Sequence, residues 1–398
     1  PEYPGNFGND HVLDDVDSDG WLDIISSGYC DRGQARPFLR TGLREYTYDQ
    51  DVFDFLPNGS VWSLHMVRLA GGEHLLMMPG EDGKSCDNHH VFFLKTEGRT
   101  PKGHPMFVEF DPLPEEMDAP PTQIFGPRMS SPMGVAIGDL NGDGFLDWAV
   151  SQDPHTSVLA GAEDWPMTEE SQNSGVFMVD SDGPKAMLAW GLAFLDLDLD
   201  GRVDIITVHG DDDPRFLLES QYVGPQYTTA HWNAGDFHFK DMTPDLGLDK
   251  RGNWRALSVG DLDGDARPDL LVGGFGEKPQ ILLNRLQTNN YHLAITLKGR
   301  TSNHLGIGAH VRVQAEENGP YQTFYMGSVG SPIALSKAEI YVGLGSASKA
   351  HFVEITWPSG VVQDLHNLES GKSHRIEEPE LMQIEPNSRH IKGNGDEK

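Results

Sequence analysis

Four short stretches of the sequence place oxygen-bearing side chains on alternate positions. The clearest is "DLNGDGFLD", in which Asp139, Asn141, Asp143 and Asp147 stand at positions 1, 3, 5 and 9, and Phe145 offers a backbone carbonyl at position 7. An all-oxygen set suits a hard cation, and Ca²⁺ takes about six to eight such ligands. Since the stretch holds no Cys or His, it disfavours zinc and copper. The spacing predicts a Ca²⁺ loop.

The same pattern occurs three more times, as "DVDSDGWLD", "DLDLDGRVD" and "DLDGDARPD". Catalysis needs one copy, whereas four copies indicate a repeated part of the scaffold, with about four Ca²⁺ ions. Ala266 stands where the other copies have glycine, so we expect a more strained turn or a lower affinity there. The predicted ligands, with a backbone carbonyl at position 7, are Asp15, Asp17, Asp19, Trp21 and Asp23; Asp196, Asp198, Asp200, Arg202 and Asp204; and Asp261, Asp263, Asp265, Arg267 and Asp269.

Each loop is followed by a short apolar run: "IISSG", "WAVSQ", "IITVHG" and "LLVGG". Such β-branched and aliphatic runs bounded by glycine are typical of buried strands. The loops also lack the glutamate at position 12 that an EF-hand places before its second helix. Each loop is therefore predicted to join two strands, so that Ca²⁺ stabilises a β-turn.

The loops begin at residues 15, 139, 196 and 261, and the first interval is about twice as long as the others. Residues 60 to 95 supply a degenerate copy with the same strand pattern, in which Arg68 stands where a ligand aspartate is expected. We expect no metal in that copy. Repeats of several short strands with glycine turns predict an all-β fold, a β-propeller whose blades stack face to face. Five blades can be traced in residues 1–288.

The stretch "VAIGDLNGDGFLDWAVS" resembles the FG-GAP or VCBS repeats of integrin α-subunit propellers and of many secreted bacterial proteins. The resemblance implies that the loop joins the first two strands of a blade and binds Ca²⁺. Propellers of this kind often have seven blades. The ring is therefore small, closed by divergent segments such as 155 to 182, or truncated at the N-terminus.

Residues 289–378 show alternating runs with glycine turns and no Ca²⁺ loop, which predicts a small β-sandwich or barrel. The pieces "GIGA" (306–309), "VGLG" (342–345) and "WPSG" (357–360) make this block similar to the ASPIC/UnbV domain of cartilage acidic protein-type secreted proteins and bacterial relatives. The segment "MGSVGSPIALS" departs from the family pattern. Residues 379–398 form a polar C-terminal tail.

The composition narrows the classes of partner. A net charge of −31 and a pI near 4.7 argue against nucleic acid, which needs clustered Lys and Arg. The sequence contains no apolar run of about 18 residues, so we predict no membrane span. Ca²⁺ sites of modest affinity favour a secreted, extracellular or periplasmic setting. Since the sequence starts with neither Met nor a signal peptide, we expect a mature or trimmed product.

Three further features have two interpretations each. Cys30 and Cys86 each follow a strand of neighbouring repeats, so they are a candidate disulfide, or two unpaired thiols. Asn58 lies in a glycosylation tripeptide, "NGS", of a kind that is frequent by chance. In the loops of the face opposite the Ca²⁺ loops, the candidate acid–base or transition-metal residues are His89, His90, His209 and Asp211, in loops where His and Asp are common anyway.

Two functions follow from these features. The first is a secreted Ca²⁺-binding structural or adhesion protein that mediates protein–protein, matrix or surface assembly, self-assembly included. The alternative is an enzyme, such as a hydrolase, lyase or cyclase, with a pocket at the propeller axis on the face opposite the Ca²⁺ loops. A blocked axis would argue against the enzyme.

Overall fold

The computed structural model describes residues 10–27, 35–53, 61–69, 72–82, 88–110, 112, 132–152, 156–163, 166–176, 187–210, 225–327, 330–331 and 334–380. The prediction of an all-β fold is confirmed: these ranges hold only one short α-helix, α1 (Ser171–Ser174), and one 3-10 turn, η1 (Gln50–Val52). Neither is long or apolar enough to cross a bilayer.

The strands of residues 11–282 form five antiparallel sheets, which we number as blades 1 to 5 in chain order. In each blade, strands that follow one another in the sequence lie side by side, as the repeat pattern predicts. The strands are β1 (His11–Asp14), β2 (Asp23–Ser26), β3 (Arg36–Gly42) and β4 (Glu45–Tyr48); β5 (His65–Arg68), β6 (His74–Asp82), β7 (Asn88–Arg99) and β8 (Pro105–Glu109); β9 (Val135–Gly138), β10 (Asp147–Ser151), β11 (Thr156–Ala160) and β12 (Thr168–Glu169); β13 (Ala189–Leu195), β14 (Asp204–His209), β15 (Thr229–Asn233) and β16 (Phe239–Asp241); and β17 (Trp254–Gly260), β18 (Asp269–Gly274) and β19 (Gln280–Leu282).

Strand β14, which follows the third of the aspartate loops, is apolar on both faces because blade 4 is packed between blades 3 and 5. Side chains alternate along a strand. In β14, Ile205 therefore packs on the blade 3 residues Ala149 and Val158, whereas Ile206 packs on Leu257 of blade 5. The first strands of neighbouring blades, such as β9, β13 and β17, contact one another and so line the axis.

Blade 5 is three-stranded in the part of the chain that is described. Leu271 occupies the position that Ile206 has in blade 4, but it is 40% exposed, and its register partner Ile281 is 64% exposed. Among the described strands, none therefore packs closely on this apolar face. The number of blades in the ring stays a prediction.

The C-terminal domain consists of two sheets around one core. One sheet has the order β25-β20-β28 and the other β22-β21-β26-β27, and Val311, Val353 and Trp357 are fully buried between them. A two-stranded hairpin, β23-β24, is separate from both sheets. The strands are β20 (Tyr291–Lys298), β21 (His310–Gln314), β22 (Tyr321–Tyr325), β23 (Gly330–Ser331), β24 (Ala334–Leu335), β25 (Ile340–Gly345), β26 (Lys349–Thr356), β27 (Val362–Glu369) and β28 (Ser373–Glu377).

The alternating runs that predicted this domain correspond to β21, β22, β25, β26 and β27, and they did not include β20 or β28. The run "YHLAITLK" of β20 is as apolar as the strands of blade 5 before it. The sequence pattern therefore does not mark β20 as the first strand of a new domain. In β28 only Ile376 is buried, and the strand is held by parallel pairing with β20. Parallel pairing of the first and last strands brings together residues almost eighty positions apart, which no local pattern indicates.

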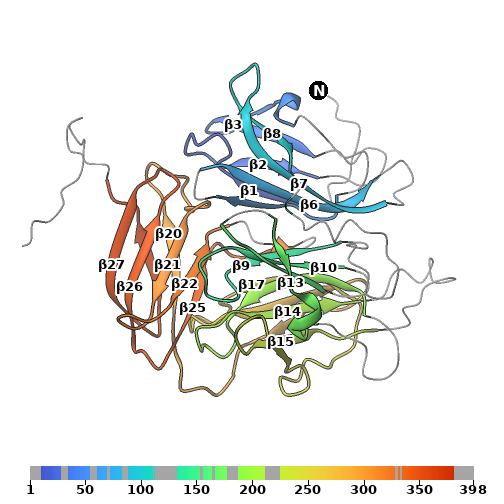
Figure 1. The fold of residues 1–398 in the computed structure, drawn as a ribbon, viewed down its shortest axis with the longest axis vertical. Helices are drawn as coiled ribbons and strands as arrows, with labels where there is room; N and C mark the ends of the chain where they lie inside the picture. The colour runs from blue at the N-terminus through green and yellow to red at the C-terminus, as the bar shows by residue number, and fades with distance from the viewer. Residues whose placement is uncertain are drawn as a thin grey trace, which may run out of the picture.

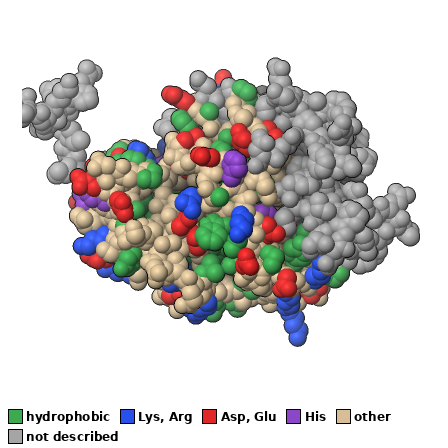
Figure 2. Space-filling model, turned by 60° about the horizontal axis from the view of Figure 1, so that its bottom comes forward, with side chains coloured by type: hydrophobic (Ala, Val, Ile, Leu, Met, Phe, Trp, Pro, Cys, Tyr) green, Lys and Arg blue, Asp and Glu red, His purple; other side chains and the backbone are tan. Residues whose placement is uncertain are grey.

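The C-terminal domain lies against one side of the blades, where the orange and red strands meet β9 and β17 (Figure 1). On the face shown in Figure 2, Lys and Arg side chains are interspersed with Asp and Glu, and no continuous basic patch is visible. The arrangement places the C-terminal domain at the ends of the strands that carry the aspartate loops.

Candidate metal centres

The four aspartate loops have one backbone geometry. We name them the first (15–23), second (139–147), third (196–204) and fourth (261–269) loops. Each connects the first two strands of its blade, as predicted. In the second loop, Asp139 accepts the N–H groups of Gly142 (2.8 Å) and Gly144 (3.0 Å), one on each carboxylate oxygen. The position-1 aspartates of the other loops also accept the N–H group of position 6, together with that of position 5 in the first and third loops and those of positions 4 and 5 in the fourth.

Position 6 must be left-handed because its N–H has to point inward to the position-1 carboxylate. Gly20, Gly144 and Gly201 have φ of +88°, +90° and +94°. Ala266 adopts the same conformation at +65°, which costs an L-residue roughly 1–2 kcal/mol. The first and third loops hold a left-handed non-glycine residue too, Ser18 and Leu199 at position 4, so the fourth loop is strained at position 6 but is not alone in such strain.

Carboxylate oxygens converge at the centre of three loops. One ligand oxygen from each member of a group lies within 4.8 Å of the others, for Asp15, Asp17 and Asp19; Asp196, Asp198 and Asp204; and Asp261, Asp263 and Asp265. In the second loop the Asn141 amide replaces one carboxylate and donates to Asp143 at 2.8 Å. The position-5 carboxylate Asp143 also accepts the N–H of Phe145 at 2.8 Å, and position 5 does the same in every loop. These sets offer hard oxygen ligands of the type that Ca²⁺ prefers.

The aspartate at position 9 has a second role that the sequence did not indicate. Asp147 accepts the N–H of Leu140 at 2.7 Å inside the loop and the N–H of Gly161 at 2.9 Å, beyond the third strand of the blade. Asp23, Asp204 and Asp269 repeat both contacts. Position 9 thus fastens the loop to the sheet, whether or not its remaining lone pairs bind metal.

Two asparagines that were not predicted join neighbouring loops. Asn233 donates from Nδ2 to the carbonyl of Leu140 in the second loop at 2.8 Å. Asn284 donates in the same way to Leu197 in the third loop at 2.9 Å. Each asparagine lies at the end of the third strand of the next blade, Asn233 as the last residue of β15 and Asn284 two residues after β19, and this shared position was a sequence signal that could have identified them.

Burial leaves the loop carboxylates with uncompensated negative charge. Burial raises the pKa of Asp147 and of Asp204 to about 8, although backbone N–H groups oppose the shift. For Asp15, burial raises the pKa to about 7, with repulsion from Asp19 and Asp17 adding to it. A divalent cation among these oxygens would favour the charged carboxylates. The loops therefore fit Ca²⁺ in charge as well as in ligand type.

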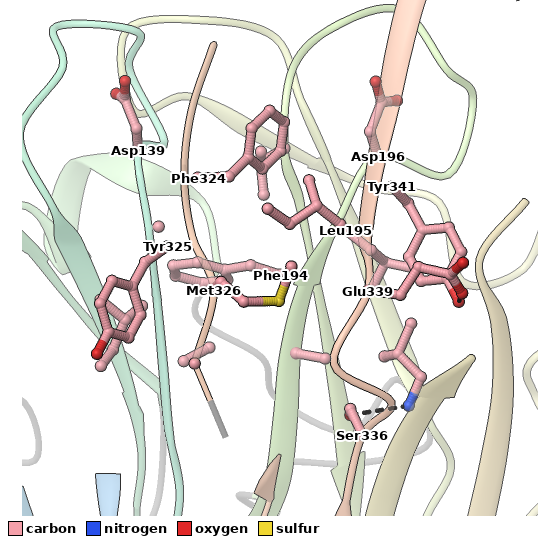
Figure 3. Close-up of a pocket in the computed structure, with 18 of the residues that line it drawn as sticks. Asp139, Phe194, Leu195, Asp196, Phe324, Tyr325, Met326, Ser336, Glu339 and Tyr341 are labelled. Atoms are coloured by element: carbon pink, nitrogen blue, oxygen red, sulfur yellow. Dashed lines mark hydrogen bonds between the residues drawn. The ribbon is translucent and has the colours of Figure 1, made fainter. Parts of the chain in front are cut away.

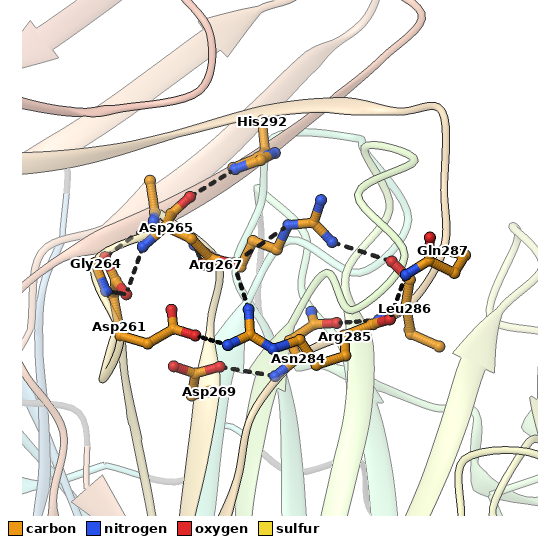
Figure 4. A network of polar contacts seen from close by, with 12 residues as sticks. Asp261, Gly264, Asp265, Arg267, Asp269, Asn284, Arg285, Leu286, Gln287 and His292 are labelled. Atoms are coloured by element: carbon orange, nitrogen blue, oxygen red, sulfur yellow. Dashed lines mark hydrogen bonds and ion pairs between the residues drawn. The ribbon is translucent and has the colours of Figure 1, made fainter.

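The fourth loop differs because arginines reach its ligands (Figure 4). Arg285 contacts Asp263 with one guanidinium nitrogen and lies 3.4 Å from Asp265 with the other. Arg267 is 3.8 Å from Asp265. In the third loop, Arg202 pairs with Asp200. Position 7 was predicted to contribute a carbonyl, and in these two loops its side chain supplies positive charge as well.

Only some of the remaining candidate residues lie in the described part of the chain. His209 was expected in an exposed loop, but it ends β14, is buried, and its Nδ1 lies 3.1 Å from the carbonyl of Tyr227. Burial lowers its pKa to about 3. His89 and His90, also expected in a loop, belong to β7. The other candidates lie outside the described residues: Asp211, Cys30, Cys86 and Asn58.

Comparison with known proteins identifies two parts of the chain. Residues 210–272 match the family described as an FG-GAP-like repeat, and residues 299–382 match the family described as ASPIC and UnbV. The chain carries FG-GAP-like repeat sequence followed by an ASPIC and UnbV domain. The third and fourth loops and their strands overlap or adjoin the first match, and β21 to β28 belong to the second. No curated protein matches the sequence significantly.

Solved structures share the fold class at low similarity. An Agrocybe aegerita lectin that recognises non-reducing terminal N-acetylglucosamine is 14% identical, with a TM-score of 0.38 over 90% of this chain and 81% of the lectin. Fructan 1-exohydrolase IIa from Cichorium intybus is 11% identical, with a TM-score of 0.39 over 95% of this chain and 98% of the enzyme. These distant similarities give no information about ligands of the FG-GAP loops.

Proposed function

We propose that this chain is a secreted, extracellular or periplasmic, Ca²⁺-binding structural or adhesion protein. The observation that supports this proposal is the repeated loop geometry. Four loops at the same place in four blades present a position-1 carboxylate held by two backbone N–H groups and further oxygens at positions 3 and 5. Repetition favours a stabilising role over catalysis, which needs a single site.

Ca²⁺ would be held by the oxygens of positions 1, 3 and 5, with the position-7 carbonyl and position 9 completing the shell. When bound, the ion supplies positive charge to a buried acidic turn. The protein's own contribution is to fix the oxygens: the backbone N–H groups orient Asp139 and Asp147, and Asn233 ties the second loop to blade 4. The FG-GAP sequence of residues 210–272 supports this assignment.

An exposed apolar face on blade 5 supports the assembly part of the proposal. Leu271 and Ile281 are register partners and point away from blade 4, and Leu283 is 41% exposed nearby in sequence. Clustered apolar side chains on a rigid sheet are typical of protein contact sites. A protein partner, a matrix component or a second copy of this chain would bury them.

Chelation tests the calcium part. A site that binds only the folded protein stabilises it by about 2.7 kcal/mol at a hundredfold excess of ligand over Kd. With several such sites we expect EDTA to lower the melting temperature by about 10 °C, and added Ca²⁺ to restore it. Mg²⁺ at the same concentration is the control, since it demands a smaller octahedral shell. An unchanged melt would refute a structural role for Ca²⁺.

Sedimentation and binding to immobilised matrix proteins, both with Ca²⁺ present, test the assembly part. Ile281→Asp should abolish self-association or matrix binding by placing a charge in the apolar face. Val362→Asp is the matched control, because Val362 is 58% exposed on a strand of the other domain. If both variants bind like the parent protein, blade 5 is not the contact surface.

A further inference from the structure

We propose that the FG-GAP loops form the seat of the ASPIC and UnbV domain, so that Ca²⁺ in the loops keeps this domain docked as a stopper on the propeller axis. Loss of Ca²⁺ would release the domain and open the axis. The inference rests on the proposed Ca²⁺ binding. It adds a Ca²⁺-dependent movement of the C-terminal domain, and it gives a function to the side of the blades that carries the aspartate loops.

The third and fourth loops are held by direct hydrogen bonds from the C-terminal part of the chain. Gly345 donates its N–H to the carbonyl of Leu199 at 3.0 Å. Asn290 donates from its side chain to the carbonyl of Asp198, also at 3.0 Å. His292 lies 3.0 Å from the carbonyl of Asp265 through Nε2. These carbonyls belong to ligand residues or their neighbours, so the shape of the loop decides where the domain can bind.

The "VGLG" motif of the ASPIC and UnbV domain is shaped for this contact. Gly343 stands directly against the third loop: a Cβ there would overlap the carboxylate of Asp196 and lie 2.6 Å from the carbonyl carbon of Leu199. Gln322 donates to the carbonyl of Gly343 at 2.8 Å and holds it in place. Glycine at this position is explained by the approach of one domain to the metal loop of the other.

Blade 2 shows how the domain docks where no loop ligands exist. Arg68, in the degenerate repeat, donates its backbone N–H to the hydroxyl of Tyr325 at 2.8 Å, and Nε2 of His310 lies 2.5 Å from the Arg68 carbonyl. The Tyr325 hydroxyl also contacts Asp14, 3.3 Å away beside the first loop. The contacts of Arg68 with Tyr325 and His310 need no metal. They are therefore the part of the interface that should persist when Ca²⁺ is removed.

The same domain also contacts strands that line the axis, near their loop ends. The hairpin β23-β24 contacts β9, β13 and β17, the first strands of three blades. Lys337 donates its N–H to the carbonyl of Val259 at 3.3 Å, and the N–H of Val259 donates to Ser336 at 3.0 Å. The described residues of "MGSVGSPIALS", the segment that departs from the family pattern, include this hairpin.

A small apolar cavity remains between the stopper and the blades (Figure 3). Phe194 comes from β13, Val259 from β17, and Phe324 and Met326 from the ASPIC and UnbV domain, and they enclose about 110 Å³. Undocking would expose these side chains to water. The apolar lining therefore favours the docked state, and the loops supply the part of the interface that responds to Ca²⁺.

Hydrogen exchange of the full chain tests the proposal, with calorimetric titration of Ca²⁺ on the same sample. In Ca²⁺ the interface amides of Val259, Lys337 and Gly345 should be protected. In EDTA they should exchange at least tenfold faster, while core amides of the domain, such as Val311 and Val353, should not change. Binding of Ca²⁺ with unchanged interface exchange would overturn the inference and leave the proposed function standing. Absence of Ca²⁺ binding would refute both.

Two variants separate the interface from folding. Gly343→Ala should expose the interface amides even in Ca²⁺. Gly273→Ala is the matched control in a blade strand, since its Cβ would meet only Ala256 at 3.4 Å. If Gly343→Ala also unfolds the domain, Asp198→Asn serves instead: it removes one ligand charge and should raise the Ca²⁺ concentration needed for protection about tenfold. Interface protection of Asp198→Asn at the parent's Ca²⁺ concentration would count against the proposal.

Discussion

The second and fourth loops share one spacing of ligands but compensate their negative charge differently. In the second loop, Asp139 and Asp143 are held by backbone N–H groups and the Asn141 amide, and no ion pair to them occurs in the described part of the chain. In the fourth loop, Arg285 reaches both Asp263 and Asp265. The ligand pattern alone thus does not decide how many ions bind.

The position of Arg285 explains the difference. It follows the third strand of blade 5 and lies next to Asn284, whose N–H binds the position-9 Asp269. A long cationic side chain at this point folds back over the loop. Blade 3 has Gly161 at the position of Asn284, and nothing at that point competes with a metal ion. We therefore expect the second loop to bind Ca²⁺ more tightly than the fourth.

Removal of the position-1 charge should give the largest contrast. Asp139→Asn is expected to lower the Ca²⁺ stoichiometry by one and to cost about 2.7 kcal/mol of stability in excess Ca²⁺. Asp261→Asn should change both quantities much less, because Arg285 already neutralises its loop. Calorimetric titration and urea unfolding measure the two effects. Equal losses in both variants would show that the fourth loop binds Ca²⁺ as tightly as the second.

Removal of the arginine should make the fourth loop resemble the second. Arg285→Ala is expected to raise the affinity of one site by about tenfold or more, roughly 1.4 kcal/mol, because two carboxylates lose their internal cation. Arg312→Ala is the matched control, since that arginine pairs with the partly exposed Glu354 of the C-terminal domain and with no loop aspartate in the described part of the chain. A variant with unchanged titration would mean that the arginine moves aside when Ca²⁺ binds.

The negative charge of Asp49 is compensated by side chains of the protein, without a metal ion. The pH dependence of its contribution to stability is therefore a reference for the carboxylates of the loops. Burial favours its neutral form, but hydrogen bonds from His104 (2.7 Å) and Lys102 (2.9 Å) outweigh burial and lower the pKa to about 2. A lowered pKa stabilises the fold above the unfolded value of about 3.9, and this contribution is lost as the pH falls toward 2.

Asp49→Asn removes this dependence. At pH 7 the variant should be less stable than the parent by about 1–2 kcal/mol, since Lys102 is half exposed and partly screened. The difference should shrink as the pH falls from 5 to 3, measured by urea unfolding at each pH. A difference that stays constant over this range would mean that shape, and not charge, is what Asp49 contributes.

The parts of the fold that depend on local pattern were predictable from the sequence. The ligand spacing gave the four loops, and the apolar runs gave the strands that follow them. The absence of metal from blade 2, expected from Arg68, stays a prediction. In each case the residues that determine the structure lie within about thirty positions of one another, so that alternation and turn chemistry are sufficient.

The parts that depend on distant contacts were not predictable. Nothing near the third loop indicates that Gly343 packs against Asp196, and nothing near Val259 indicates that Lys337 reaches it through the axis. His209 was misplaced because the boundary of β14 depends on pairing with Ala189 and on burial, and not on the polar residues that follow it. Contacts between domains determine the first two features, and strand pairing within blade 4 determines the third.

The smallest contrast concerns position 6 and can be tested in both directions. Ala266→Gly should relieve a left-handed alanine and stabilise the protein by about 1 kcal/mol or less, because the added freedom of glycine in the unfolded chain offsets part of the gain. Gly144→Ala should cost a similar amount. Its Cβ would meet only Thr323 at 3.9 Å, so the effect comes from the backbone and not from a clash.

Urea unfolding in EDTA measures the contribution of the backbone to stability, and the same measurement in Ca²⁺ adds any change in Ca²⁺ affinity. If Ala266→Gly stabilises only in Ca²⁺, the alanine limits ion binding in the fourth loop, whereas equal gains in both conditions would leave Arg285 as the main cause of the difference between the two loops.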